Sequence, residues 1–247
     1  MKKIIINLIM IFSCMSLLAQ KKKEQYRLLP SFPITVDGSL AEWGDQLFMM
    51  DPDSSWGFAI SNDAHFIYVA VQVKDPILQQ DATRHGILIN INKEAKKKDA
   101  AQLLFPVPDA ETLRAMANDD NLPNLNVREE LIKRSRGYQV KGFDQIVDGL
   151  LSFENTYEVH AVAKLLPNDR LVYEAKIPLE SVAIKDIQKD IAIQIMINNR
   201  FAQLQKLMKN RPNTRQSVYG RTYNSSPSLK NPYKVKTDIW WVGKLNE

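Results

Sequence analysis

The 247-residue sequence has very little cysteine and histidine: Cys14 is the only thiol, and there are three histidines. One cysteine cannot form a disulfide framework within the chain. Glycine and proline are also few, at 9 and 12 residues, which excludes collagen and flexible linker proteins. A hydrophobic content of 45% excludes the composition of a disordered chain. The sequence therefore predicts a globular protein that is stabilised by its own hydrophobic core.

Sequence motifs of common enzyme and metal sites are also absent. There is no Gly-x-Ser-x-Gly elbow, no phosphate-binding loop, and no His-x-His, His-Glu-x-x-His or Cys-x-x-Cys-His spacing. We therefore expect a protein that is not an enzyme and that holds no cofactor. A structural calcium ion is the alternative that the aspartates leave open, because Ca²⁺ binds carboxylate oxygens. The candidate ligands, which suit turns better, are Asp51, Asp53, Asp63, Asp75 and Asp81.

The one long apolar run lies at the N-terminus and has the layout of a secretory signal peptide. Lys2 and Lys3 precede the apolar residues 4–18, and Ala19 is a small residue at the cleavage point. The run is too short for a typical transmembrane helix. Residues 1–19 are therefore predicted to be a signal peptide that is cleaved after Ala19. The protein would be exported to the periplasm, the outer surface or the medium.

Cleavage at this point has two consequences for the mature chain. It removes Lys2 and Lys3, so the formal net charge falls from +5 to +3, which is too small an excess to indicate nucleic-acid binding. It also removes Cys14, unless this residue is instead lipidated as in a lipoprotein, which is the alternative processing. Residues 20–29 would form an N-terminal linker, and residues 30–247 the folded domain.

Several segments of the mature chain alternate between apolar and polar residues with period two, as a half-buried β-strand does. Turn-forming residues separate several of these runs, for example Pro167–Asp169. Short strands with few helices predict an all-β protein, an antiparallel β-sandwich of the immunoglobulin-like or jelly-roll-like kind. The predicted strands cover residues 67–73, 87–91, 159–165, 171–177, 191–197 and 238–245.

Two regions interrupt this pattern. Residues 93–143 are predicted to be a partly helical insertion, with helices over about 109–117 and 126–136. Asn126 followed by Glu129 resembles a capping box at the start of the second helix. Residues 203–237 are predicted to be a long basic loop with no acidic residue, and such loops are often functional. Its eight basic residues are Lys206, Lys209, Arg211, Arg215, Arg221, Lys230, Lys234 and Lys236.

The four tryptophans are candidates for both core packing and ligand binding. Trp43 follows an Asp-Gly turn and is expected in the core. Trp56 stands between polar residues and a strand, so its sequence position leaves core and surface equally open. Trp240 and Trp241 are neighbours in a predicted strand and must point to opposite faces.

Three segments together resemble the family 9 carbohydrate-binding modules and the wider DOMON-like β-sandwich superfamily. They are Ile34–Trp43, which looks like the family's opening strand, Asp-Gly turn and Trp; Ser61–Pro76, which is similar to its central hairpin ending in Lys-Asp-Pro; and Tyr173–Pro178, which looks like a late strand. The resemblance implies a β-sandwich over about residues 30–245, and it implies sugar binding by tryptophans that stack on a pyranose ring.

The chain departs from the family where the first stacking Trp is expected. The corresponding loop, residues 77–86, contains no aromatic side chain other than the imidazole of His85. We therefore expect a non-catalytic, exported module that binds a surface or extracellular glycan, with an acidic glycan as one candidate. The alternative is a structural or protein-interaction component of the cell envelope. The candidate ligand-binding residues are Arg84, His85, Arg211, Arg215, Arg221, Tyr223 and Tyr233.

Overall fold

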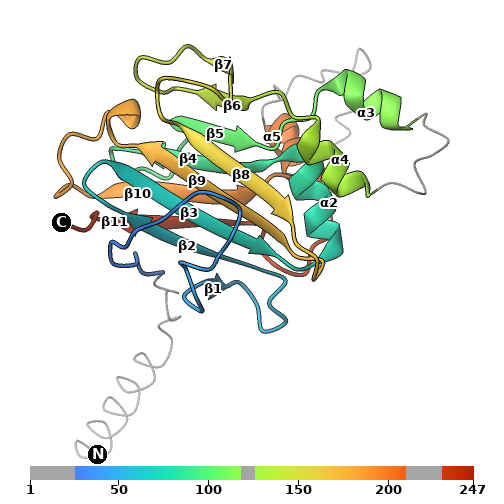
Figure 1. Ribbon diagram of the computed structural model, residues 1–247, viewed down its shortest axis with the longest axis horizontal. Helices are drawn as coiled ribbons and strands as arrows, with labels where there is room; N and C mark the ends of the chain where they lie inside the picture. The colour runs from blue at the N-terminus through green and yellow to red at the C-terminus, as the bar shows by residue number, and fades with distance from the viewer. Residues whose placement is uncertain (1–25, 118–125, 210–229) are drawn as a thin grey trace, which may run out of the picture.

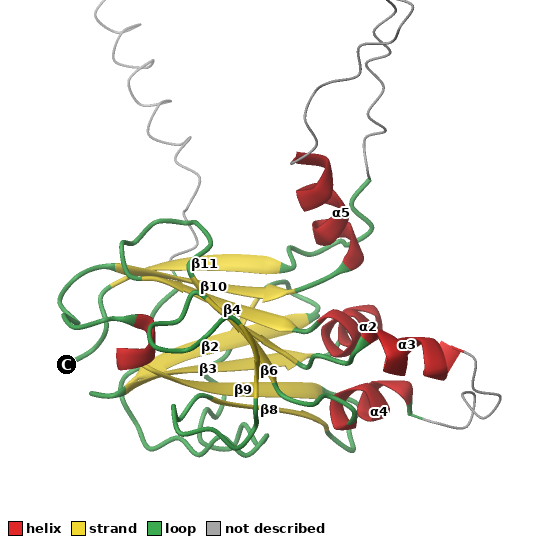
Figure 2. Ribbon diagram, turned by 90° about the horizontal axis from the view of Figure 1, so that it is seen from above, coloured by secondary structure: helices red, strands yellow, loops and turns green. Residues whose placement is uncertain are grey.

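Two antiparallel β-sheets, packed face to face, form the body of the protein (Figures 1 and 2). The structure is a computed structural model, and it describes residues 26–117, 126–209 and 230–247. Sheet A has five strands in the order β1-β2-β3-β9-β8. These strands are β1 (Phe48–Met49), β2 (Trp56–Asn62), β3 (Phe66–Val73), β8 (His160–Leu165) and β9 (Leu171–Pro178).

Sheet B has six strands in the order β11-β10-β4-β5-β6-β7. All of its pairings are antiparallel, as are those of sheet A. The predicted antiparallel β-sandwich is therefore confirmed. The strands of sheet B are β4 (Ile87–Asn92), β5 (Ala101–Phe105), β6 (Tyr138–Lys141), β7 (Gly149–Leu151), β10 (Ile191–Ile197) and β11 (Asp238–Gly243).

Alternate side chains of both sheets fill the space between them. Ile91 of β4 lies opposite Ile193 of β10, and Trp241 of β11 lies opposite Ile193 on its other side. All of these side chains are buried, and one hydrophobic cluster joins both sheets. Trp240 points to the outer face and is half-buried, as expected for neighbours in a strand. The period-two pattern of the sequence thus identifies the inward-facing residues correctly.

The chain before β1 covers the outer face of sheet A. Leu29 donates its N–H to the carbonyl oxygen of Ile60 at 2.8 Å, and its side chain is buried. The predicted linker, residues 20–29, is therefore wrong at its end, because residues 26–29 pack on the sandwich. Trp43 is fully buried against the outer face, as expected, in a second apolar cluster. The stretch before it forms no strand at 34–36, unlike the family pattern.

The region predicted as an insertion, residues 93–143, belongs partly to sheet B. β5 pairs with β4 and β6 pairs with β5, so that Leu103 and Val140 lie opposite each other and are fully buried. The predicted insertion is therefore too long, because only residues 106–137 lie between β5 and β6. These strands have five and four residues, which is too short for a period-two pattern to stand out.

The two helices of this region begin where the sequence indicates. In front of α3 (Ala110–Ala117), Asp109 Oδ1 accepts the N–H of Thr112 at 2.6 Å. α4 (Val127–Lys133) follows Asn126, but the Asn126 side chain makes no capping hydrogen bond. The predicted capping box is therefore wrong, because its side-chain hydrogen bond does not form. The helix also ends earlier than predicted.

Three helices gather at one end of the sandwich. These are α2 (Pro76–His85), α3 and α4, whereas the 3-10 helix η3 (Glu180–Val182) and the C-terminus lie at the opposite end (Figure 2). Because β3 and β5 both run into this end, as does the β8–β9 turn, the helices close it over the core. None of the helices within the described ranges is both long and apolar enough to cross a membrane.

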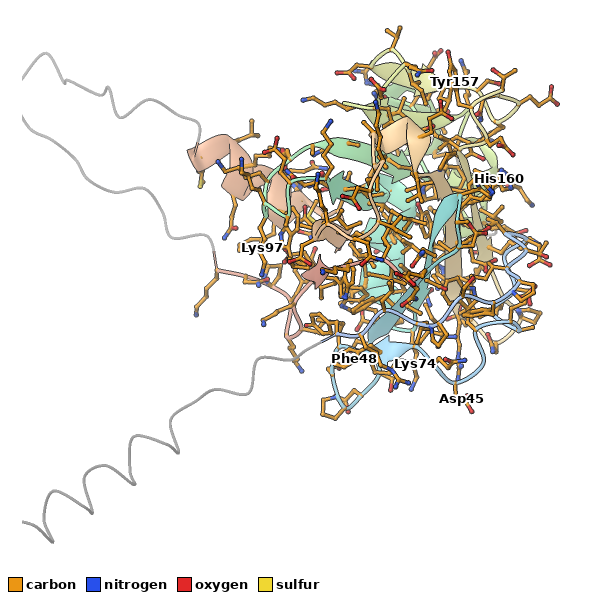
Figure 3. The ribbon with its side chains drawn as sticks, turned by 90° about the vertical axis from the view of Figure 1, so that its left-hand side faces the viewer. Asp45, Phe48, Lys74, Lys97, Tyr157 and His160 are labelled. Carbon is orange, nitrogen blue, oxygen red and sulfur yellow. The ribbon has the colours of Figure 1, made fainter. Side chains whose placement is uncertain are left out.

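The basic stretch 203–237 is not a loop throughout. Its residues 203–209 belong to helix α5 (Arg200–Lys209), which follows β10. Its residues 210–229 lie outside the part of the chain that the structure describes. Figure 3 shows Lys97 on the side of α5. Lys97 and Asp99 lie in the loop between β4 and β5. Asp99 Oδ2 lies 2.9 Å from Nζ of Lys206, and this ion pair connects the loop to α5.

A candidate ligand-binding cleft beside helix α2

A cleft of about 710 Å³ lies where three segments meet at the helical end of the sandwich. One wall is the loop 51–55 between β1 and β2, and a second is the first half of α2. The third is the segment 232–235, which leads to β11. Each wall is anchored to the sheets by contacts that are independent of a ligand.

The start of α2 is fixed by a strong local signal. Asp75 caps the helix, since its Oδ1 accepts the N–H groups of Ile77 at 2.8 Å and Leu78 at 2.9 Å, and Pro76 occupies the first turn. Gly86 ends the helix with φ 82°, a left-handed value that glycine adopts freely. As a result Leu78 is buried in the core, while Ile77 remains 64% exposed at the cleft.

The loop 51–55 is held to the same point. Ser55 O accepts the N–H groups of Lys74 and Asp75, at 2.8 and 3.0 Å. Asp51 in turn accepts the N–H and the hydroxyl of Ser55, both at 2.7 Å. This double contact keeps the loop closed and leaves the side chain of Asp53 at its exposed tip.

Two tethers fix the segment 232–235. Trp56 is fully buried, which decides its position in favour of the core, and its Nε1–H donates to Lys236 O at 2.8 Å. Tyr233 donates its hydroxyl to Asp81 Oδ2 on α2 at 2.5 Å. Burial and this hydrogen bond raise the pKa of Tyr233, so the phenol keeps its proton and remains a donor at neutral pH.

The charged side chains that line the cleft are more acidic than basic, with four aspartates and two lysines. Asp51, Asp75 and Asp81 accept the hydrogen bonds given above. Within residues 26–117, 126–209 and 230–247, the side chains of Asp53 and Lys74 make no hydrogen bond or ion pair, and both are exposed. A ligand can therefore reach these two groups, as it can the exposed Lys234, without displacing a described protein contact.

The aspartates do not gather as metal ligands. In the part of the chain that the structure describes, no three His, Cys, Asp or Glu side chains are arranged to hold a metal ion. Asp51, Asp63 and Asp75 accept backbone N–H groups in turns and at the start of α2, so the reading of these three as turn formers is confirmed.

Of the predicted ligand-binding residues, Tyr233 lines the cleft. Arg84 and His85 lie on the last turn of α2 and do not line it. The predicted loop 77–86 is a helix, since Asp75 and Pro76 begin one. Burial lowers the pKa of His85, and Arg84 acts in the same direction, so this imidazole is neutral at pH 7 although it lies 4.0 Å from Asp81.

The other predicted residues, Arg211, Arg215, Arg221 and Tyr223, lie outside the described residues. The sequence analysis missed Lys74 and Asp53 as candidate glycan-binding residues, and considered Asp53 only as a possible calcium ligand. In the sequence, Lys74 is part of the Lys-Asp-Pro motif. This motif precedes an exposed helix start, and it is the signal that could have located the cleft.

Comparisons with known proteins add a structural likeness. No family model matches the sequence, and no curated protein is similar to it in sequence. Among solved structures, the chain is similar to a family 9 carbohydrate-binding module from Caldicellulosiruptor kristjanssonii in complex with glucose. The two share 12% sequence identity with a TM-score of 0.39, over 72% of this chain and 81% of that chain.

Proposed function

We propose that the protein is an exported, non-catalytic module that binds a glycan in the cleft beside α2. The proposal is supported by the groups that the cleft brings together. The side chains of Asp53 and Lys74 make no described hydrogen bond or ion pair, and they lie in the same cleft as the half-buried ring of Tyr233 and the exposed side chain of Ile77. Sugars present hydroxyl groups and apolar C–H faces together, and this lining offers partners for both.

A binding role suits the cleft better than catalysis. Glycosidases use two carboxyl groups that are both available to the substrate. Among the described residues that line the cleft, Asp51, Asp75 and Asp81 are engaged in holding its walls together. Only Asp53 remains, so the lining does not supply an acid and a base.

The charge of the cleft favours a neutral glycan. Four aspartates against two lysines repel a carboxylate or sulfate, whereas a neutral hydroxyl can donate to Asp53 and accept from Lys74. An acidic glycan is the second candidate, and it is supported by a different feature, the stretch 203–237 with its eight basic residues and no acid. That ligand would use Arg211, Arg215, Arg221 and Tyr223 rather than the cleft.

A glycan array that contains neutral and acidic oligosaccharides, followed by calorimetric titration of the best ligand, tests the proposal. Asp53→Asn should lower the affinity for a neutral glycan roughly tenfold, the usual effect of losing a hydrogen bond to a charged group. The matched control is Asp45→Asn, because Asp45 is exposed at the surface, does not line the cleft and is labelled in Figure 3.

Three results would contradict the proposal in different ways. Equal affinities of both variants and the parent would exclude the cleft. Binding of acidic glycans alone, unaffected by Asp53→Asn, would move the site to the basic stretch. If no glycan binds, the alternative function, a structural or interaction component of the cell envelope, becomes the better explanation.

A further inference from the structure

A second hollow, of about 450 Å³, lies on the other side of the first turns of α2. Pro76, Ile77 and Gln80 line both this hollow and the cleft, so the two are neighbours that share one ridge. The far wall of the second hollow comes from the start of α4 and from Asp169 in the β8–β9 turn. Figure 2 shows α2 and α4 side by side at this end of the sandwich.

A network of contacts around the buried side chain of Gln79 fixes this second hollow. Gln79 is fully buried, and its Nε2 donates to Asp169 O at 2.7 Å and to Val73 O at 3.0 Å. Arg128 of α4 bonds to Oε1 of Gln79 and places Nη2 2.7 Å from Asp169 Oδ1. Since Gln79 and Arg128 join α2, α4 and the β8–β9 turn, the walls are held in place before any ligand arrives.

The hollow still offers groups that make no contact among residues 26–117, 126–209 and 230–247. The side chain of Asn126, at the start of α4, is exposed and makes no capping hydrogen bond. Gln80 is exposed on the shared ridge, next to Ile77. The charge of Arg128 is matched by Asp169, so this part of the groove carries no excess of either sign. Its free groups are therefore neutral amides beside an apolar ridge.

We propose that the second hollow is a further subsite, and that the ligand is an oligosaccharide chain that crosses the ridge at Ile77. The inference rests on the function proposed above. One sugar unit would lie in the cleft against Asp53 and Lys74. The chain would pass over Ile77 with a C–H face toward it, and the next units would exchange hydrogen bonds with the amides of Gln80 and Asn126.

The test is a calorimetric titration with ladders of defined neutral oligosaccharides, from one to four units, of β-linked glucose, N-acetylglucosamine and mannose. For a ladder that binds, the affinity should rise at least tenfold between one unit and the length that fills both hollows, and then stay constant. Asn126→Ala should lower the affinity for the longer members about three- to tenfold, the range for one neutral hydrogen bond, and leave the single sugar unchanged.

Asn168→Ala is the matched control, because Asn168 is an exposed amide in the neighbouring turn and lines neither hollow. Both alanine variants should melt like the parent, since neither side chain holds a described contact. If the single sugar binds as tightly as the longest chain, or if Asn126→Ala and Asn168→Ala behave alike, the subsite is excluded and the cleft stands. If no ladder binds, the proposed function itself fails, and the subsite with it.

Discussion

At the scale of single residues, the buried carboxyl of Glu174 joins distant parts of the chain. Glu174 is fully buried on the outer face of β9. It accepts Nε1–H of Trp43 and N–H of Gly38, both at 2.8 Å, and N–H of Asp37 at 3.2 Å. One side chain thus holds the segment 37–43 against sheet A. Burial raises the pKa of Glu174, and these three hydrogen bonds oppose the shift.

The raised pKa of Glu174 predicts a pH dependence of stability. The folded protein holds this proton more tightly than the unfolded chain does, so the contribution of the group is complete below its ordinary pKa of 4.5 and is lost as pH rises through the raised value. Each pKa unit corresponds to about 1.4 kcal/mol. Glu174→Gln removes this pH-dependent contribution. It also destabilises the fold at every pH, because the amide N–H₂ replaces one acceptor oxygen and faces the donor side of Trp43 or of Asp37 and Gly38.

Denaturant unfolding of parent and Glu174→Gln between about pH 4 and pH 7 measures the effect. The stability advantage of the parent should be largest at the acid end and should shrink as pH rises. Glu154→Gln is the control, because Glu154 is exposed and makes no described contact. A difference between parent and variant that does not vary with pH would contradict the raised pKa.

At the scale of elements, sequence patterns identified several long regular strands but missed two short strands and one helix. The runs over β3, β4, β9 and β10 were recognisable, because six to eight residues in each show which face is buried. β5 and β6 were missed because they are short and are separated by helices. α2 was missed for another reason: family resemblance suggested a loop at 77–86, although Asp75, Pro76 and Gly86 are the start and stop signals of a helix.

The cap of α2 leads to a prediction for this helix. Asp75→Ala removes the acceptor for two N–H groups and should cost about 0.5–2 kcal/mol. For a chain of this size, that corresponds to a lower melting temperature by roughly 1–8 °C. Glycan affinity should fall as well, because Ile77 and Gln80 on the first turns line the cleft.

The conservative variant separates capping from charge. Asp75→Asn keeps a good capping side chain and should melt within about 1–2 °C of the parent, since asparagine caps nearly as well as aspartate. Thermal melting followed by circular dichroism is sufficient. If the alanine and asparagine variants melt alike, the carboxyl of Asp75 does not act as the cap.

At the scale of the whole molecule, the candidate site depends on contacts that no local pattern encodes. The hydrogen bond between Tyr233 and Asp81 joins residues 152 positions apart. Sequence analysis selected Tyr233 for its aromatic ring, but it could not show that Asp81, Asp53 and Lys74 lie in the same cleft. The fold class follows from side-chain periodicity, whereas the cleft follows from three-dimensional closure at the end of the sandwich.

The C-terminal segment connects both sheets. β11 pairs with β10 at the edge of sheet B, where it buries Ile239 and Trp241. Beyond it, Asn246 donates its N–H to Asn62 Oδ1 at 2.9 Å, and Asn62 Nδ2 donates to Asn246 O at 3.0 Å. The side chain of Asn246 also donates to Leu29 O at 2.5 Å. A strand of sheet B is thereby fastened to β2 of sheet A and to the segment that precedes it.

Deleting residues 238–247 should therefore unfold the whole sandwich rather than loosen one edge. Three buried side chains are lost, Ile239, Trp241 and Leu245, and each contributes roughly 1.5–3 kcal/mol. Their sum is comparable to the total stability of a domain, roughly 5–15 kcal/mol. The deletion also exposes the edge of β10, which favours aggregation.

Removal of Glu247 alone is the control, because its contact with Gln188 is exposed. Thermal and denaturant melts should show no cooperative transition for the long deletion and a parent-like transition for the short one. A parent-like melt of the long deletion would mean that the two sheets stay packed without β11 and the C-terminal contacts.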